Sequence, residues 1–225
     1  MKPEERENMH YLKGKENEIA IEENLLFSLL PKNNANINKK ILDIGCGVGS
    51  ISIKLKDRGF IVTGVDFSTI GIEKAKERGI DAILTDIDKS GLNFQDNYFD
   101  VVWAGDIIEH VFDPIFLFKE INRVLKKDGI LLLTTPNDFN LYSRLLIFLK
   151  GKSIQSGIYR KLKMCKHHTF FSWELLEYMF RSAGFVLNYF SSVLIFPRTN
   201  IEIITKNKTL GRLFGRIFII SLKIK

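Results

Sequence analysis

Cysteine is scarce in this sequence. Its 225 residues contain only Cys46 and Cys165, which lie far apart and have no partner at metal-like spacing. Such a pair provides neither a disulfide framework nor a zinc-type cysteine site. This excludes small domains that are stabilised by disulfides or by cysteine-bound zinc. A reducing compartment is the simplest interpretation of this cysteine usage, and we expect a cytoplasmic protein.

Long hydrophobic runs are also missing. No run reaches the roughly 20 residues that a membrane-spanning helix needs, and residues 1–7 are mostly charged, without an apolar signal segment. Hydrophobic residues nevertheless make up 45% of the chain, which is enough for a sizeable core and is not the composition of a disordered protein. We therefore expect one globular domain with appended segments.

Acidic residues become rare in the last third of the chain. Residues 1–140 hold 18 Lys or Arg and 23 Asp or Glu, whereas residues 141–225 hold 15 and 3, giving net charges of −5 and +12. This asymmetry indicates an anionic partner for the C-terminal part: a phosphorylated substrate, a nucleic acid or a membrane surface. The alternative is a solvated basic face that only aids solubility.

The most informative stretch is glycine-rich. An apolar run over residues 40–44 is followed by Gly45, Gly47 and Gly49, and a helical pattern begins directly afterwards. This order predicts a strand, a tight turn and a helix start, where backbone N–H groups favour a negative group of a ligand. The glycine spacing differs from the dinucleotide motif G-x-G-x-x-G, because that motif would place its third glycine at Ser50.

Strands and helices alternate along most of the chain, which is typical of a parallel, doubly wound sheet. The expected fold is α/β, with a Rossmann-like seven-stranded sheet, mostly parallel and closed by an antiparallel C-terminal strand. For residues 209–225 the alternative to a closing strand is a basic amphipathic helix on a membrane surface; the β-branched isoleucines favour the strand. Strands are expected at 40–44, 60–65, 81–84, 99–104, 130–135, 185–194 and 217–224, and helices at 4–30, 50–57, 69–78, 114–126, 139–149, 172–183 and 210–215.

Acidic residues follow two of the expected strands. Asp66 ends the second strand, where a carboxylate can accept hydrogen bonds from both ribose hydroxyls of an adenosine, and Phe67 is placed to stack nearby. Ser68 can cap the next helix, which frees Asp66 for a ligand. Asp86, after the third strand, can accept from an adenine amino group, with Ile87 against the ring.

Several motifs resemble those of class I S-adenosylmethionine (SAM)-dependent methyltransferases, in particular the ubiquinone/menaquinone-type and related small-molecule enzymes. The resemblance covers residues 40–137 and is carried by D-x-G-x-G-x-G at 43–49, FDVV at 99–102, EHV-x-DP at 109–114, RVLK-x-x-GIL at 123–131 and T-x-PN at 134–137. It implies SAM as cofactor. The residues expected to bind it are Asp43, Gly45, Cys46, Gly47, Gly49, Asp66, Phe67, Asp86, Ile87 and Gly105.

Histidines near the expected strand ends are the candidate general bases. His110 follows the fourth strand and His167 precedes the helix at 172–183, so both could reach the same edge of the sheet; the alternative is a structural role. Together with Asp106 and Glu109 they also resemble the E-x-x-E-H plus distal His site of some metal-dependent methyltransferases. Because Asp106 replaces the first Glu with a shorter arm, we predict no metal and interpret the cluster as polar residues at a helix start.

The sequence thus predicts methyl transfer to oxygen or carbon of a small molecule, anionic or linked to a lipid or glycan. The alternatives are an RNA methyltransferase and a SAM-binding accessory protein without catalysis. A nucleic acid is a possible partner but is not favoured. The basic C-terminal third could also contact a membrane surface peripherally. The sequence indicates no oligomeric state. The expected parts are a helical cap (1–38), a SAM-binding core (39–137), a basic substrate-side insertion (138–171) and a closing helix with strands (172–225).

Overall fold

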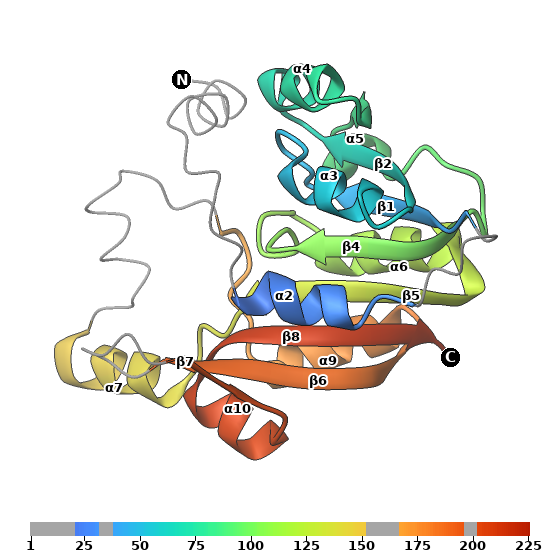
Figure 1. Cartoon of the computed structure of the whole chain (residues 1–225). Helices are drawn as coiled ribbons and strands as arrows, with labels where there is room; N and C mark the ends of the chain where they lie inside the picture. Colours follow the sequence, from blue (N-terminus) through green and yellow to red (C-terminus); the bar gives the residue numbers. More distant parts are fainter. Residues whose placement is uncertain (1–20, 32–37, 152–166, 196–201) are drawn as a thin grey trace.

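The computed structural model describes residues 21–31, 38–151, 167–195 and 202–225 (Figure 1). Its strands are β1 Lys40–Ile44, β2 Ile61–Asp66, β3 Asp81–Leu84, β4 Phe99–Gly105, β5 Leu125–Pro136, β6 Phe185–Ile195, β7 Glu202–Thr205 and β8 Gly215–Ile224. Its helices are α2 Ile21–Ser28, α3 Ser50–Lys56, α4 Thr69–Glu77, α5 Ile87–Ser90, α6 Pro114–Val124, α7 Leu141–Lys150, α9 Trp173–Ser182 and α10 Lys208–Phe214. Most of the expected N-terminal helix lies outside the described residues, and so do residues 152–166 of the basic insertion.

All the strands form one mixed sheet in the order β3-β2-β1-β4-β5-β8-β6-β7. The first five strands pair in parallel, and β8 pairs antiparallel with both β5 and β6. The predicted α/β class, the parallel core and the antiparallel closing strand are therefore confirmed. Strand order reverses between β1 and β4, so the carboxyl ends of these two neighbours flank the switch point where such sheets bind ligands.

The predicted count of seven strands is wrong by one. The extra strand, β7, pairs antiparallel with β6 residues Ser192–Ile195, in a stretch where no strand was predicted. Its β-branched Ile203, Ile204 and Thr205 suit a strand, but their run is short and polar residues flank it, so the pattern was missed. The structure also contains the single-turn helix α5, which was not predicted. Strand β5 begins at Leu125, five residues earlier than predicted.

Helices cover both faces of the sheet. Alternate residues of the central strands point to opposite faces: Ile41, Val101 and Leu132 pack with α2 and α3, whereas Leu42, Val102 and Leu131 belong to the core that includes α6 and α9. Figure 1 shows α2 and α3 in front of the sheet, with α6 and α9 behind it. This two-sided burial explains why the inner strands are apolar on both faces. None of the described helices has both the length and the apolar character needed to span a bilayer.

Asn137, directly after β5, ties the C-terminal elements to the end of the parallel sheet. Its side-chain amide donates to the carbonyls of Arg212 at 3.0 Å and Gly215 at 2.9 Å, and its backbone N–H donates to the carbonyl of Arg216 at 2.7 Å. Asn137 is only 3% exposed, so bulk water cannot easily replace its amide as the hydrogen-bond donor to these carbonyls.

We predict that Asn137→Ala lowers the free energy of unfolding by about 1–3 kcal/mol, because it leaves buried carbonyls without a donor. Urea denaturation followed by circular dichroism measures this loss. Asn188→Ala is the control, since Asn188 is exposed and its amide donates to the Ser221 hydroxyl at 3.2 Å. Equal losses in the two variants would contradict the anchoring role of Asn137.

Candidate active site

The turn between β1 and α3 has the conformation that its glycines permit. Gly45, Gly47 and Gly49 have φ angles of 73°, 52° and 79°, a region that other L-residues rarely adopt. The N–H groups of Gly45 and Cys46 both donate to the carbonyl of Val65, at 2.8 and 3.1 Å. These bonds hold the turn against the end of β2.

The Asp66 carboxylate fixes the same turn from its side chain. One of its oxygens accepts from the Gly47 N–H at 2.9 Å, and the other accepts from the Ser68 N–H at 2.8 Å. As predicted, Ser68 caps α4, because its hydroxyl accepts from the Gly71 N–H at 3.1 Å. An ionised carboxylate only accepts hydrogen bonds, and at the tip of β2 it lies where sheets of this kind bind ligands.

A cavity of about 160 Å³ opens beside the turn, at the carboxyl ends of β1 and β4. Three of its lining residues are acidic, namely Glu23, Asp43 and Asp106, and none is a lysine or arginine. An acid-lined cavity of this kind favours a cationic ligand. The remaining lining residues are Leu26, Gly45, Cys46, Ile51, Trp103, Gly105 and Thr134.

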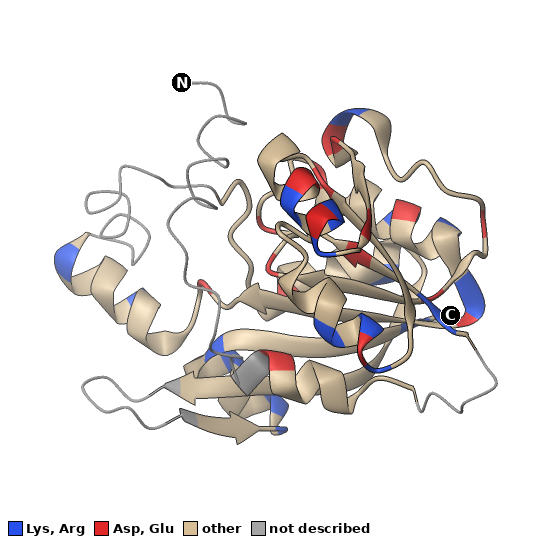
Figure 2. Cartoon of the chain, turned by 45° about the horizontal axis from the view of Figure 1, so that its top comes forward, with Lys and Arg blue, Asp and Glu red and all other residues tan. Residues whose placement is uncertain are grey.

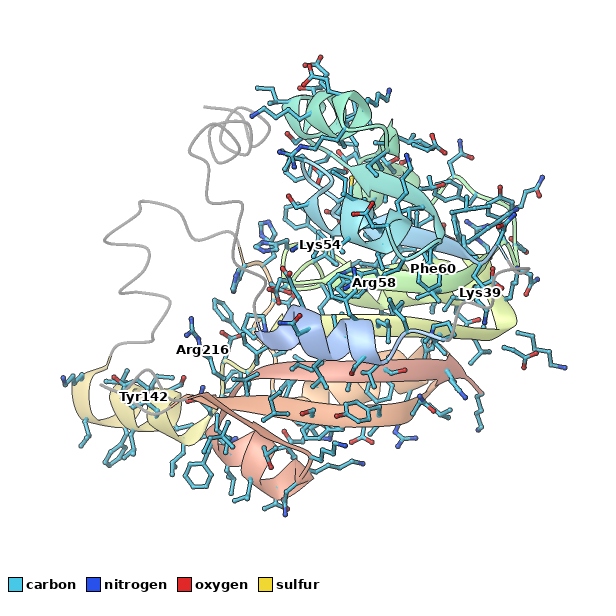
Figure 3. The ribbon with its side chains drawn as sticks, in the orientation of Figure 1. Lys39, Lys54, Arg58, Phe60, Tyr142 and Arg216 are labelled. Atoms are coloured by element: carbon cyan, nitrogen blue, oxygen red, sulfur yellow. The ribbon has the colours of Figure 1, made fainter. Side chains whose placement is uncertain are left out.

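Helix α2 forms one wall of this cavity and is fastened to α3. Lys54 of α3 forms an ion pair with Glu23 at 3.3 Å, and the guanidinium of Arg58 lies 4.1 Å from the centre of the Phe27 ring. Both basic side chains are marked in Figure 3, on the side of the sheet that carries α2. The Phe27 ring also packs against Trp103 of β4, with 5.0 Å between ring centres. The described part of this N-terminal helix thus packs on the sheet and also borders the cavity.

Burial shifts the protonation of the acids beside the cavity. Asp43 is 2% exposed, and burial raises its pKa to about 7, although the Ser52 hydroxyl donates to it at 2.6 Å. Burial likewise raises the pKa of Asp106, whose carboxylate accepts from the Thr134 hydroxyl at 2.9 Å. A bound cation would reverse these shifts, because an opposite charge favours the ionised form.

The two candidate base histidines meet after β4, as predicted. The rings of His110 and His167 lie edge to face with 4.9 Å between their centres. They meet because the N–H groups of His168 and Thr169 donate to the carbonyl of Glu109, at 2.7 and 3.2 Å. Burial lowers the pKa of His167, which favours the neutral imidazole that a general base requires. Neither histidine lines the cavity itself.

Glu109 completes a cluster with these histidines. Its carboxylate is buried, accepts from the Thr135 hydroxyl at 3.1 Å, and has a pKa that burial raises to about 8. Glu109, His110 and His167 each offer one ligand atom, and these atoms lie within 4.8 Å of one another. This donor set suits Zn²⁺ or Mn²⁺. Asp106, the fourth residue of the candidate metal motif, is not in the cluster, and the expectation that the chain binds no metal remains a prediction.

The predicted cofactor residues divide into two groups in the structure. Asp43, Gly45, Cys46 and Gly105 line the cavity. The others extend along the same edge of the sheet toward β3: Gly47 and Gly49 in the turn, Asp66 and Phe67 after β2, and Asp86 and Ile87 after β3. Phe67 is 40% exposed, Asp86 pairs with Lys89, and the Thr85 N–H donates to the Asp66 carbonyl, which joins the ends of β2 and β3.

Sequence reasoning missed several residues of the cavity wall. Glu23 and Leu26 come from the expected N-terminal helix, in which neither residue was assigned to a ligand site, and Trp103 lies within an apolar strand that predicts core packing. Thr134 was noted as part of a motif, but without a contact. The signal for Trp103 and Thr134 was their position at the ends of strands beside the switch point.

Part of this chain is similar in sequence to known proteins. The family model described as a methyltransferase domain matches residues 42–133, from β1 to β5. A ubiquinone biosynthesis O-methyltransferase of Haemophilus ducreyi is 36% identical over 115 residues, which are 47% of this chain and 49% of that protein. A 2-methyl-6-phytyl-1,4-hydroquinone methyltransferase of Synechocystis is 39% identical over 101 residues, 43% of this chain and 32% of that protein. The chain thus spans half or less of these curated relatives.

Solved structures extend the likeness over nearly the whole chain. A SAM-dependent methyltransferase from Thermotoga maritima superposes with a TM-score of 0.67 and 26% identity, covering 91% of this chain and 88% of its own. The matched region contains the glycine turn, the strand-end acids and the switch point described above. Residues 42–133 thus match a methyltransferase domain, and the chain is similar in fold to a SAM-dependent methyltransferase over nearly its whole length.

Proposed function

We propose that the protein transfers the methyl group of SAM to an oxygen or carbon atom of a small molecule. The observation that carries this proposal is the acid-lined cavity beside the glycine turn, at the switch point between β1 and β4. SAM is a cation at its sulfur, and Glu23, Asp43 and Asp106 supply the complementary charge. When bound there, SAM supplies an electrophilic methyl group.

The residues along the edge of the sheet fit the nucleoside half of SAM. Asp66 lies at the tip of β2, where a carboxylate can accept hydrogen bonds from ribose hydroxyls, and the half-exposed Phe67 offers an apolar face beside it. Asp86 and Ile87 follow the neighbouring strand, where the adenine ring would lie. The cationic and nucleoside ends of one ligand would therefore span from β4 to β3.

His110 and His167 are the candidates for removing a proton from the acceptor. Both sit on segments that follow the carboxyl ends of β4 and β5, and the lowered pKa of His167 keeps its imidazole neutral near pH 7. A phenol or enol acceptor needs such a base, because its conjugate oxygen or carbon anion is the better nucleophile.

One exposed arginine and the names of the relatives support an anionic small molecule as the methyl acceptor. Arg216, at the start of β8, lies close enough to Asp106 to oppose the rise in the pKa of that carboxyl, and in Figure 3 it projects between α2 and α7. Such a position suits an acceptor with a negative group. The acceptors in the names of the relatives are small molecules, which favours a small molecule over RNA and catalysis over an accessory role.

We predict that Asp66→Asn weakens SAM binding by roughly 10–100-fold, because hydrogen bonds to a charged group are lost. Isothermal calorimetry measures the affinity, and circular dichroism confirms that the variant is folded. Asp128→Asn, at an exposed position of β5, should bind as the wild type does. If Asp66→Asn does not fold, Phe67→Ala tests the same subsite. Wild-type affinity in either folded variant would contradict the assignment.

We also predict that His110→Ala or His167→Ala lowers the rate of methyl transfer by about 10²–10⁴-fold while SAM affinity stays unchanged. Mass spectrometry of small molecules from a cell extract, incubated with labelled SAM, measures the transferred methyl group. His168→Ala is the control, since this exposed histidine stacks on Phe112 at 4.2 Å.

Two results would count against the proton-transfer role. One is a wild-type rate in both histidine variants. The other is a loss of activity in EDTA that added Zn²⁺ or Mn²⁺ restores, because this would assign Glu109, His110 and His167 to a metal instead.

A further inference from the structure

Helix α7 exposes an unusual amount of apolar surface. Among its ten residues only Ser143 is buried, whereas Phe148 is 85% exposed and Leu149 is 69% exposed. A water-soluble surface rarely carries so many large apolar side chains together without a binding partner. The exposed apolar residues of α7 are Leu141, Tyr142, Leu145, Ile147, Phe148 and Leu149.

The neighbouring helix α10 continues this surface. It contacts α7, and it exposes Leu210, Leu213 and Phe214. In Figure 1 both helices lie at the same end of the molecule, beside the ends of β6 and β7. We call the exposed side chains of α7 and α10 the α7–α10 surface.

All charged residues of these two helices are basic. Arg144 and Lys150 belong to α7, Lys208 and Arg212 belong to α10, and neither helix contains an acid. Figure 2 shows the ribbon of α7 with blue bands and no red. A cleft of about 300 Å³ lies between the helices and the start of α9, and its lining includes Arg144 and Arg212. Arg212 also pairs with Glu174, another residue of this lining.

We infer that the α7–α10 surface docks the protein on an anionic lipid bilayer. Exposed Phe, Leu and Ile side chains gain free energy on entering the boundary between headgroups and acyl chains, and the lysines and arginines attract anionic headgroups. The same positive charge would attract a nucleic acid, but a nucleic acid offers no apolar environment for aliphatic side chains such as Leu149 and Ile147. The combination of both kinds of residue therefore favours the bilayer.

This docking goes beyond the proposed methyl transfer and does not depend on it. The α7–α10 surface is separate from the cavity proposed for SAM. None of the residues that line this cavity belongs to the surface or to the cleft beside it. It is tied to the same end of the sheet through Asn137, which bonds the carbonyls of Arg212 and Gly215. A bilayer contact there would place the carboxyl end of β5 near the lipid surface.

Co-sedimentation with lipid vesicles tests the inference with the full chain. We expect binding to vesicles of phosphatidylcholine mixed with phosphatidylglycerol, weaker binding at high salt, and little binding to phosphatidylcholine alone. The double variant Phe148→Ser/Leu149→Ser should bind the anionic vesicles at least about tenfold more weakly. Tyr178→Ser, which removes a 63% exposed aromatic side chain from α9, should bind like the wild type.

A charge variant separates the electrostatic part of the contact. Lys150→Gln should weaken vesicle binding about fivefold, whereas Lys127→Gln, at an exposed site in β5, should not change it. Equal vesicle binding by all variants, or no binding to anionic vesicles, would overturn the inference. So would a dimer in sedimentation velocity that the Phe148/Leu149 variant abolishes, or RNA binding that needs the same residues.

Discussion

The hydrogen bond from the Gly47 N–H to the buried Asp66 carboxylate is the contact on which the site depends. It joins the turn after β1 to the tip of β2, and the bonds from Gly45 and Cys46 to the Val65 carbonyl reinforce the same joint. The turn is thereby held beside the cavity at the switch point. The same carboxylate lies at the strand end where we propose that it also accepts from the ribose of SAM.

The sequence predicted the parts of this arrangement that are local. The glycine turn, the Ser68 cap and most of the parallel strands follow from patterns within a few residues, and the structure confirms them. The closing strand β8 was predicted because isoleucines favour strand. The meeting of His110 and His167 was also predicted, because His110 was expected just after the fourth strand and His167 just before the helix at 172–183, at the same edge of the sheet. Their chemical roles, like those of the cofactor residues, stay predictions.

The sequence could not predict features that depend on contacts between distant segments. The cavity needs Glu23 and Leu26 from α2, and their position is set by the packing of Phe27 and Arg58 rather than by any motif. The short strand β7 forms only because β6 offers it an edge. The basic excess of the last third was visible in the composition, but its union with exposed apolar residues on α7 and α10 appears only when side-chain exposure is known.

The central claim is that the acid-lined cavity holds the cationic centre of SAM. Calorimetric titration with SAM and with S-adenosylhomocysteine, whose sulfur is uncharged, tests it most directly. With a pKa of about 7 in the empty protein, Asp43 becomes ionised between pH 6 and pH 8. The ratio of the two affinities should therefore shift toward SAM by up to about tenfold over this range, and Asp43→Asn should flatten the shift. A ratio that is the same at pH 6 and pH 8 in the wild type would contradict the account.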